Sequence, residues 1–304
     1  MDLYSRLCSI AGEKNILKDE PMSRHTTFRI GGPADYFVMP SSAEEIRQVV
    51  ALCVEEELPY YIIGNGSNLL VGDKGYRGVI IQVFKNMNAI RVEGETIYAQ
   101  AGALLSKVAS AACAAELAGF EFASGIPGTL GGAVRMNAGA YGGEMSQVLK
   151  NAVVLTTEGD ILKLSVDEMK MGYRTSIVSR MDYVVLEAEI ALTKGNREEI
   201  RAKIEELREK RVSKQPLEYG SAGSTFKRPE GYFAGKLIQD AGLRGFRIGN
   251  AQVSEKHCGF VINRGDATSS SGARSEKNRR VLTDAFSDCD RNVRSGEDNS
   301  FENA

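Results

Sequence analysis

The sequence predicts an α+β fold. An amphipathic helix between two short apolar runs, an alanine-rich helix and two hairpin signals centred on glycine follow one another without a regular alternation of strand and helix. A doubly wound sheet would require that alternation, so a mixed arrangement is favoured. The length of 304 residues allows about two domains, each with a sizeable core.

A β-α-β unit is predicted near the N-terminus. The apolar run 36–39 is followed by Ser41 or Ser42, either of which can cap a helix with acidic residues in its first turn. The strand 60–63 follows this helix. Helical spacing gives the helix one buried face, formed by Ile46, Val49, Val50 and Cys53.

Two β-hairpins are predicted farther along the chain. The first spans 90–99 and turns at Gly94, and the second spans 153–164 and turns at Gly159. Single strands are also expected, at 79–83 and 183–192.

Two further helices are predicted. The stretch 102–117 is rich in alanine, the residue with the highest helix propensity. The stretch 197–211 is highly charged, and its charges are expected to form a solvated surface. A new segment begins near Ser213, so a domain boundary is placed at 195–215.

The composition argues against several classes of protein. The net charge is −2, without the basic stripe that binds nucleic acid. Five widely spaced cysteines without a Cys-x-x-Cys pair, and only two histidines, argue against a disulfide framework and a Cys or His metal site. The N-terminus lacks a signal-peptide core, and no stretch approaches the roughly 20 apolar residues of a membrane span. We therefore expect a cytoplasmic protein without membrane insertion or a metal.

The first of three glycine-rich loops directly follows the strand 60–63. Its sequence is Gly64-Asn65-Gly66-Ser67-Asn68. Glycines permit close backbone approach, and consecutive N–H groups in such a turn can bind an anion. Leu69 stands where a Rossmann fingerprint has its third glycine, and no Walker A sequence follows. A plain turn at the end of a strand is an equally good interpretation of this loop alone.

The second loop, residues 125–143, contains seven glycines in nineteen residues. Glycine loses more conformational entropy on folding than other residues, so this density indicates a compensating role. Close passage of the backbone along a large flat or phosphorylated ligand would supply that role. The interleaved apolar residues favour burial over an irregular surface loop.

The third loop, residues 220–229, presents Ser224 among small residues. Lys227 and Arg228 follow it, and Lys236 lies a little farther on, a pattern that suits an anionic substrate. The loop is not a nucleophile elbow, which needs a glycine two residues after the serine, and no histidine partner is evident. A serine-rich turn without a catalytic role is the alternative.

Taken together, these loops resemble a known family. Ordered motifs with family-like spacing are similar to those of the UDP-N-acetylenolpyruvoylglucosamine reductases, over about residues 20 to 270. The short spacing between Tyr173 and Ser224 resembles the compact subclass of that family. The motifs are residues 24–34, the first two loops, Tyr173-Arg174-Thr175-Ser176, residues 220–229 and residues 232–245.

The resemblance implies an FAD-binding unit of the vanillyl-alcohol-oxidase (PCMH) type. This unit would comprise subdomains at 1–84 and 85–196, followed by an α+β substrate-binding domain at 197–270 and an atypical tail at 271–304. The first loop would hold the FAD pyrophosphate, and the second would run along the flavin. The implied FAD ligands are Arg29, Gly64, Asn65, Gly66, Ser67, Asn68, Gly125, Ile126, Pro127, Gly128, Thr129, Gly131, Gly132, Ala133, Asn137 and Gly139.

The resemblance also implies a ping-pong reduction in peptidoglycan precursor synthesis. NADPH reduces FAD and leaves, and UDP-N-acetylglucosamine enolpyruvate then receives the hydride at C3, because no side chain can donate one. Arg174 would stabilise negative charge that develops on the substrate carboxylate. Ser224 would donate a proton to C2. A monomer is expected, and the implied substrate ligands are Tyr173, Lys227, Arg228 and Lys236.

The resemblance ends after Ser270. The reductases continue with an amphipathic helix and a strand that carries a catalytic glutamate, whereas residues 271–304 have a polar composition that cannot order itself. Arg294 stands about where that glutamate would fall, and Glu297 and Glu302 lack the expected neighbours. Three hypotheses follow: an active reductase, a flavin-binding protein with impaired or no reductase activity, and an FAD oxidase acting on another substrate.

Overall fold

The computed structural model describes residues 1–270 and 301–303. Contacts within the chain divide it into two compact units, each assembled from three stretches. Unit 1 consists of Met1–Lys18, Tyr36–Asn65 and Gly78–Arg211, and unit 2 of Asp19–Asp35, Gly66–Arg77 and Val212–Ala304. The composition gives no sign of this discontinuity, and the division at residues 84, 196 and 270 stays a prediction.

The predicted amphipathic helix is confirmed as α2 (Ala43–Glu55) in unit 1. The side chain of Ser42 accepts a hydrogen bond from the backbone N–H of Glu45, so Ser42 is the cap. All four side chains of the predicted apolar face are buried. This helix packs beside α1 (Leu3–Ala11), which begins at a second side-chain cap, Asp2, and was not predicted.

The predicted strand 60–63 is confirmed as β3 (Tyr60–Ile63), which runs parallel to β5 (Tyr76–Gln82). In their register Tyr60 lies opposite Val79. β5 stands between β2 and β3, so the two strands of the predicted β-α-β unit share a sheet but are not direct neighbours. The sheet order is β1 (Ile16–Pro21), β2 (Pro33–Val38), β5 and β3.

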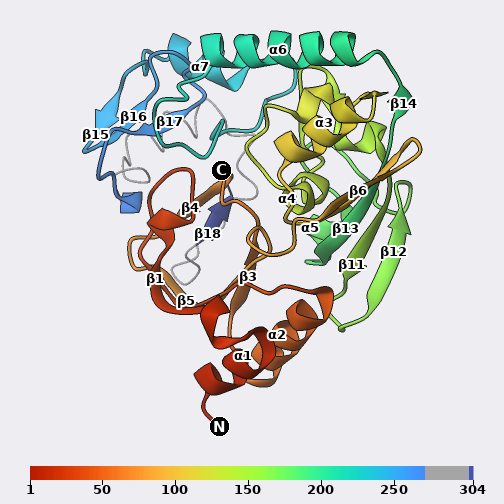
Figure 1. The fold of residues 1–304 in the computed structure, drawn as a ribbon. Helices are drawn as coiled ribbons and strands as arrows, with labels where there is room; N and C mark the ends of the chain where they lie inside the picture. The colour runs from red at the N-terminus through yellow and green to blue at the C-terminus, as the bar shows by residue number, and fades with distance from the viewer. Residues whose placement is uncertain (271–300, 304) are drawn as a thin grey trace. The chain divides into compact units, whose positions relative to one another are not determined.

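Both predicted hairpins are confirmed in one five-stranded antiparallel sheet of unit 1. β6 (Ile90–Glu93) pairs with β7 (Thr96–Gln100), and β11 (Leu149–Leu155) pairs with β12 (Ile161–Ser165). β13 (Val184–Ala191) lies between the hairpins, which gives the order β12-β11-β13-β7-β6. In Figure 1 the strands of this sheet lie side by side, and the helices α3 and α4 pack against its β6, β7 and β13 strands.

The alanine-rich helix α3 (Leu105–Ala114) is shorter than the predicted stretch 102–117. At its start, the carbonyl of Ala103 accepts a hydrogen bond from the backbone N–H of Leu130, at 2.8 Å, instead of from a helical N–H. After its end, the chain enters the short strand β8 (Leu117–Ala118). Contacts made elsewhere in unit 1 therefore set both ends of this helix.

The charged helix is confirmed as α6 (Arg197–Lys214), the long helix at the top of Figure 1. Most of its charges are solvated as expected, because Lys203, Arg208 and Lys210 form exposed ion pairs with glutamates of the same helix. Arg211 departs from that expectation, since it is partly buried.

Unit 2 has smaller elements and two small apolar clusters, one around Phe28 and one around Ile238. β18 (Phe301–Asn303) pairs antiparallel with β4 (Leu69–Val71). Residues 271–304 were predicted to be a poorly ordered tail. Apart from β18, this prediction concerns residues outside those that the structure describes. The other regular elements of unit 2 are α7 (Ala234–Asp240), β15 (Arg247–Ile248), β16 (Ala251–Val253) and β17 (Val261–Asn263).

The remaining elements are short. They are the helices α4 (Leu130–Arg135) and α5 (Ile177–Arg180), the 3-10 turns Glu13–Asn15, Met22–Arg24, Glu121–Ala123 and Met145–Gln147, and the strands β9 (Gly139–Ala140), β10 (Gly143–Glu144) and β14 (Thr193–Lys194). The helix α4 and the strand β9 lie in the second glycine-rich loop, and β10 begins at its last residue.

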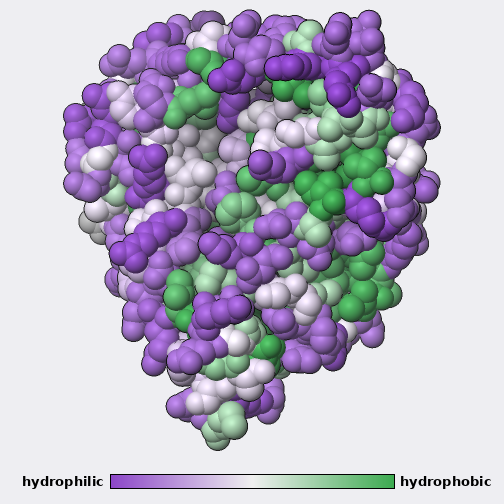
Figure 2. All heavy atoms as spheres, viewed as in Figure 1, coloured by the Kyte–Doolittle hydropathy of each residue, from purple (hydrophilic) through white to green (hydrophobic). Residues whose placement is uncertain are grey.

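The surface in the view of Figure 2 is mainly hydrophilic, with hydrophobic residues gathered over the five-stranded sheet. Among the described residues, no helix combines the length and the apolar character needed to cross a lipid bilayer. The described cysteines are free thiols, namely Cys8, Cys53, Cys113 and Cys258.

Candidate functional site

The first and second glycine-rich loops meet in unit 1. The side-chain amide of Asn65 donates a hydrogen bond to the carbonyl of Pro127 at 2.9 Å, although the two residues are far apart in the sequence. A β-carbon added at Gly64 would lie 2.2 Å from the hydroxyl oxygen of Thr129. A side chain at position 64 would therefore displace Thr129, and these contacts hold Gly64 and Asn65 of the first loop beside Pro127 and Thr129 of the second.

Thr129 carries an unsatisfied polar atom at this junction. The residue is 2% exposed, and among the described residues no group forms a hydrogen bond with its Oγ1. A buried hydroxyl without a partner costs about 1–3 kcal/mol. A phosphate or ring oxygen of FAD could accept the hydrogen bond, so this hydroxyl fits the cofactor that the sequence implies.

The glycines of the second loop do not all serve the same purpose. The backbone N–H of Gly131 donates to the carbonyl of Ala101 at 2.8 Å, and an added β-carbon would lie 2.8 Å from the Ala101 β-carbon. Packing inside the protein therefore explains Gly131. At the exposed Gly132, an added β-carbon would meet only the Thr129 hydroxyl, at 3.8 Å. No contact within the described residues requires glycine there, and the role of Gly132 as an FAD ligand stays a prediction.

Asn137 fixes the shape of the second loop. It is 1% exposed and has a positive φ of 45°. Its side-chain amide donates to the carbonyl of Gly172 at 3.1 Å, and its side-chain oxygen accepts from the backbone N–H of Ser146 at 2.9 Å. Both ends of the amide are used within unit 1, so the structure gives Asn137 a positioning role beside its predicted role as an FAD ligand.

Arg174 is held on the second loop. The backbone N–H and C=O groups of Gly172 and Thr175 pair with each other and form a tight turn that presents Tyr173 and Arg174. The guanidinium donates to the carbonyls of two second-loop residues, Asn137 at 3.4 Å and Gly139 at 3.1 Å.

The charge of Arg174 is not neutralised by the part of the protein that the structure describes. There, no carboxylate forms an ion pair with this guanidinium, whose central carbon lies 5.3 Å from the centre of the Tyr173 ring. An ordinary surface salt bridge, the simplest alternative to a functional role, is therefore not what holds this arginine.

Ser224 lies in unit 2, where the backbone N–H of the next residue, Thr225, donates to the carbonyl of Gly259 at 2.8 Å. A β-carbon at Gly259 would stand 3.0 Å from the Ser224 hydroxyl oxygen and 2.9 Å from Cε1 of His257. The serine hydroxyl and the histidine ring therefore flank the same glycine. No histidine partner was evident from the sequence, because His257 lies 33 residues from the serine and in no recognisable motif.

Burial lowers the pKa of His257 from its ordinary value of 6.5. Its Nδ1 accepts a hydrogen bond from the backbone N–H of Gly259 at 3.1 Å. An accepting Nδ1 carries no proton, so the imidazole is neutral and its proton is on Nε2.

The three predicted cationic substrate ligands differ in their surroundings. Lys236 forms an ion pair with Asp240 one turn later on α7. Arg228 lies over the ring of Phe233, 4.0 Å from its centre, and is exposed. Lys227 is also exposed. The Nε–H group of Arg228 also donates a hydrogen bond to the carbonyl of Tyr232 at 3.1 Å, so both Lys236 and Arg228 have partners within unit 2.

The predicted FAD ligands Arg29 and Gly66 lie in unit 2. A β-carbon at Gly66 would stand 1.9 Å from the carbonyl oxygen of His25, and Gly66 has a positive φ of 61°. The side-chain amide of Asn263, which was not predicted, donates to the carbonyl of Arg29 at 3.3 Å. The motif at 24–34 is thereby fixed against the first loop and against the sheet of unit 2. Ser67 and Asn68 are partly buried residues of the same loop.

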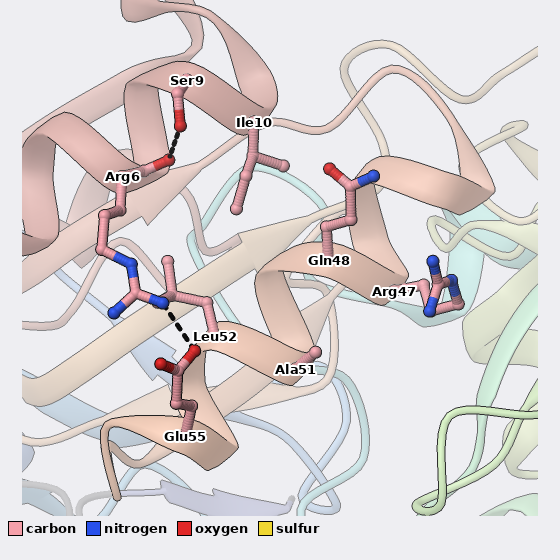
Figure 3. Close-up of a pocket in the computed structure, with 8 residues that line it drawn as sticks. All are labelled: Arg6, Ser9, Ile10, Arg47, Gln48, Ala51, Leu52 and Glu55. Atoms are coloured by element: carbon pink, nitrogen blue, oxygen red, sulfur yellow. Dashed lines mark hydrogen bonds and ion pairs between the residues drawn. The ribbon is translucent and has the colours of Figure 1, made fainter.

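A surface groove of about 310 Å³ lies elsewhere, between α1 and α2 (Figure 3). An ion pair between Arg6 and Glu55 crosses it. None of the predicted site residues lines this groove, so it is not the predicted site.

Comparisons with known proteins agree with these features. Residues 34–165 match the model of an FAD binding domain, and residues 215–274 match the C-terminal domain of UDP-N-acetylenolpyruvoylglucosamine reductase. The reductase of Clostridioides difficile is 52% identical over 267 residues, and that of Clostridium perfringens is 55% identical over 268; in both cases the match covers 88% of each chain.

Solved structures show the same relationship. The reductase from Thermus caldophilus has a TM-score of 0.76 and 34% identity, with 86% of this chain and 93% of that chain covered. Phl p 4, a grass pollen allergen with glucose dehydrogenase activity, has a TM-score of 0.51 at 15% identity over 64% of this chain and 45% of that chain, a likeness of fold alone. The α+β fold with an FAD-binding unit of the vanillyl-alcohol-oxidase type is thus confirmed. By its two domain matches and by these identities, the chain belongs to the UDP-N-acetylenolpyruvoylglucosamine reductase family.

Proposed function

We propose that this chain reduces UDP-N-acetylglucosamine enolpyruvate to UDP-N-acetylmuramate, a step of peptidoglycan precursor synthesis, with NADPH as reductant and FAD as bound cofactor. Family membership supports this proposal. The structural observation that carries it is Arg174, a cation that two carbonyls fix on the second glycine-rich loop and that no described carboxylate neutralises.

FAD, when bound, supplies the hydride that no side chain can donate. Thr129 would contact it, because its hydroxyl lacks a partner among the described residues, and Gly64 leaves room for that hydroxyl between the two loops. No contact within the described residues requires glycine at position 132. The absence of a side chain there would allow the backbone to approach FAD closely.

Arg174 would bind the substrate carboxylate and stabilise the negative charge that grows there during reduction. Its planar guanidinium can make two parallel hydrogen bonds to a carboxylate, which a lysine cannot. Because two backbone carbonyls already orient it, little reorganisation is needed as the charge develops.

Ser224 would donate a proton to C2 of the substrate and regain one from water. A serine hydroxyl is a weak acid, so this role depends on placement close to the carbon. The exposure of Ser224 in unit 2 is consistent with access of substrate and water to the hydroxyl. The exposed cations Lys227 and Arg228 of the same loop would bind the substrate diphosphate, with Lys236 and Tyr173 as further contacts.

The proposal includes two FAD-binding subdomains at 1–84 and 85–196 and a substrate-binding domain at 197–270. The FAD-domain match at 34–165 and the C-terminal match at 215–274 support this order along the chain. A cytoplasmic location and a monomeric state belong to the same proposal.

Anaerobic stopped-flow spectroscopy of the purified protein tests this function. We expect a flavin absorption band, loss of that band on mixing with NADPH, and its return on mixing with UDP-N-acetylglucosamine enolpyruvate. Bleaching without return would select a flavin-binding protein with impaired reductase activity. Protein that binds no flavin even when FAD is added would refute the proposal, and oxygen consumption with an alcohol would select an oxidase.

A further inference from the structure

Arg211 differs from the other cations of α6, which are all exposed, in being partly buried. Lys203, Arg208 and Lys210 form exposed ion pairs with glutamates of the helix. Arg211 is partly buried, and no carboxylate in the described part of the chain pairs with it. Its guanidinium instead donates a hydrogen bond to the carbonyl of Gly125, at the start of the second glycine-rich loop.

The fit between Arg211 and Gly125 is close. A β-carbon at Gly125 would lie 3.3 Å from Cδ of Arg211 and 3.8 Å from its Nη1. A larger residue at 125 would therefore press on the arginine stem. The absence of a side chain at this glycine leaves room for a cation beside the backbone of the loop.

This guanidinium is placed where a positive charge is unfavourable without an anion. Burial lowers the pKa of Arg211, and Tyr141 partly opposes that effect. A neutral carbonyl satisfies one N–H group but does not balance the charge. The chain as a whole has a net charge of −2, so an anionic ligand has to be attracted by local cations of this kind.

We propose that Arg211 is an FAD-contacting residue that sets its positive charge against negative charge of the cofactor at the second glycine-rich loop. This inference rests on the proposed function, which places FAD along that loop. FAD offers negative charge from two sources. Its diphosphate is charged in every oxidation state, whereas its ring gains negative charge only on reduction, and a neighbouring cation then raises the reduction potential.

Two substitutions and one matched control test the proposal. Arg211→Met removes the charge but keeps an unbranched stem beside Gly125, and Arg211→Lys keeps the charge. Arg208→Gln removes an exposed cation of the same helix, one turn earlier. For each protein, the dissociation constant of FAD is measured by fluorescence titration of the apoprotein, the reduction potential of the bound flavin by spectroelectrochemistry, and the stability of the apoprotein by thermal unfolding.

Contact with the diphosphate predicts that Arg211→Met weakens binding of oxidised FAD about 10- to 100-fold with an unchanged potential. Contact with the ring predicts nearly unchanged binding of oxidised FAD and a potential lower by about 30 mV for each tenfold loss of affinity for the reduced form. In either case Arg211→Lys should recover most of the effect, and Arg208→Gln should match the wild type.

The proposal is overturned if Arg211→Met binds FAD and sets its potential as Arg208→Gln does, or if Arg211→Lys behaves like Arg211→Met. A lower stability of apo Arg211→Met, without either FAD effect, would show that Arg211 only anchors the loop. If Arg211→Met does not fold, Arg211→Lys tests the proposal. Wild-type FAD affinity and flavin reduction potential in Arg211→Lys would support a role for the charge. Losses as large as those predicted for Arg211→Met would refute it. If the wild-type protein binds no FAD, the proposed function itself is refuted, and not only the role of Arg211.

Discussion

The hydroxyl oxygen of Thr129 lies directly in front of the α-carbon of Gly64, only 2.2 Å from the place where a β-carbon would stand. The first glycine-rich loop is therefore fitted to the second at an atom that has no hydrogen-bond partner among the described residues. In the proposed function, this contact belongs to the FAD site.

Gly64→Ala and Gly132→Ala should distinguish a glycine required by packing within the protein from a glycine required for FAD binding. Alanine at 64 displaces Thr129, so we expect apoprotein stability to fall by about 1–3 kcal/mol and FAD affinity to fall with it. Alanine at 132 meets no protein atom closer than 3.8 Å and lies in a helix, so apoprotein stability should hold or rise by up to about 1 kcal/mol. FAD titrations of both apoproteins would check this, and unchanged affinity in Gly132→Ala would remove the ligand explanation.

Thr129→Val should affect apoprotein stability and FAD affinity in opposite directions. Valine has nearly the same shape without the buried unpaired hydroxyl, so we expect the apoprotein to be unchanged or more stable by about 1 kcal/mol. FAD affinity should fall about tenfold, because the hydrogen bond from the hydroxyl is lost. Thr129→Ser, which keeps the hydroxyl, is the control. If Thr129→Val lowers the stability of the apoprotein and leaves FAD affinity unchanged, then the hydroxyl stabilises the fold and does not bind FAD.

Arg174→Met should separate the two half-reactions. Reduction by NADPH should stay within a few-fold of wild type, whereas reoxidation by the enolpyruvyl substrate should slow about 10²- to 10³-fold, the usual loss for one charge-stabilising group. Rapid mixing under anaerobic conditions measures both rates. Arg180→Gln, at an exposed arginine of the same region, should leave both rates unchanged. Equal slowing of both half-reactions would speak against the carboxylate role of Arg174.

Ser224→Ala should likewise leave reduction by NADPH intact and block reoxidation by substrate, because only the second half-reaction needs a proton at C2. Ser221→Ala, three residues earlier, is the matched control and should behave as wild type. An alanine variant that is reoxidised at the wild-type rate would exclude Ser224 as the proton donor.

His257 should make stability depend on pH. Burial lowers the pKa of this imidazole below its ordinary 6.5, so the unfolded chain takes up a proton that the folded chain resists. The contribution of this effect to stability is present above pH 6.5 and is lost as the pH falls through the lower, folded-state pKa. Urea unfolding between about pH 5 and 8 should show this decline in wild type. His257→Gln should show a flatter profile, and parallel profiles would contradict the assignment.

Local features were predicted well from the sequence. The amphipathic face of α2, both hairpins and the charged helix α6 depend on periodicity and turn chemistry within one short stretch. The helix predicted at 102–117 was too long, because its first turn is lost to hydrogen bonds with the second loop. Alanine content carries no information about such a partner.

The contacts that surround the candidate site could be predicted only in part. Glycine density and motif order pointed to the two loops, but whether each glycine serves the ligand or the protein depends on contacts such as that of Gly131 with Ala101. Arg211 was predicted to belong to the solvated surface of the helix. The charge pattern of a helix does not show which residues of other elements contact it, here Gly125. His257 was missed because its proximity to Gly259 and Ser224 is tertiary.

The composition of unit 2 from three distant stretches has a consequence during synthesis. Phe28 and Ile30 leave the ribosome long before Ala222 and Ala251, the residues against which they are buried. Chains emerge N-terminus first, at about 5–20 residues per second, so these apolar side chains lack their partners for about 10–40 seconds. A nascent chain of this protein therefore exposes apolar surface that the folded protein buries.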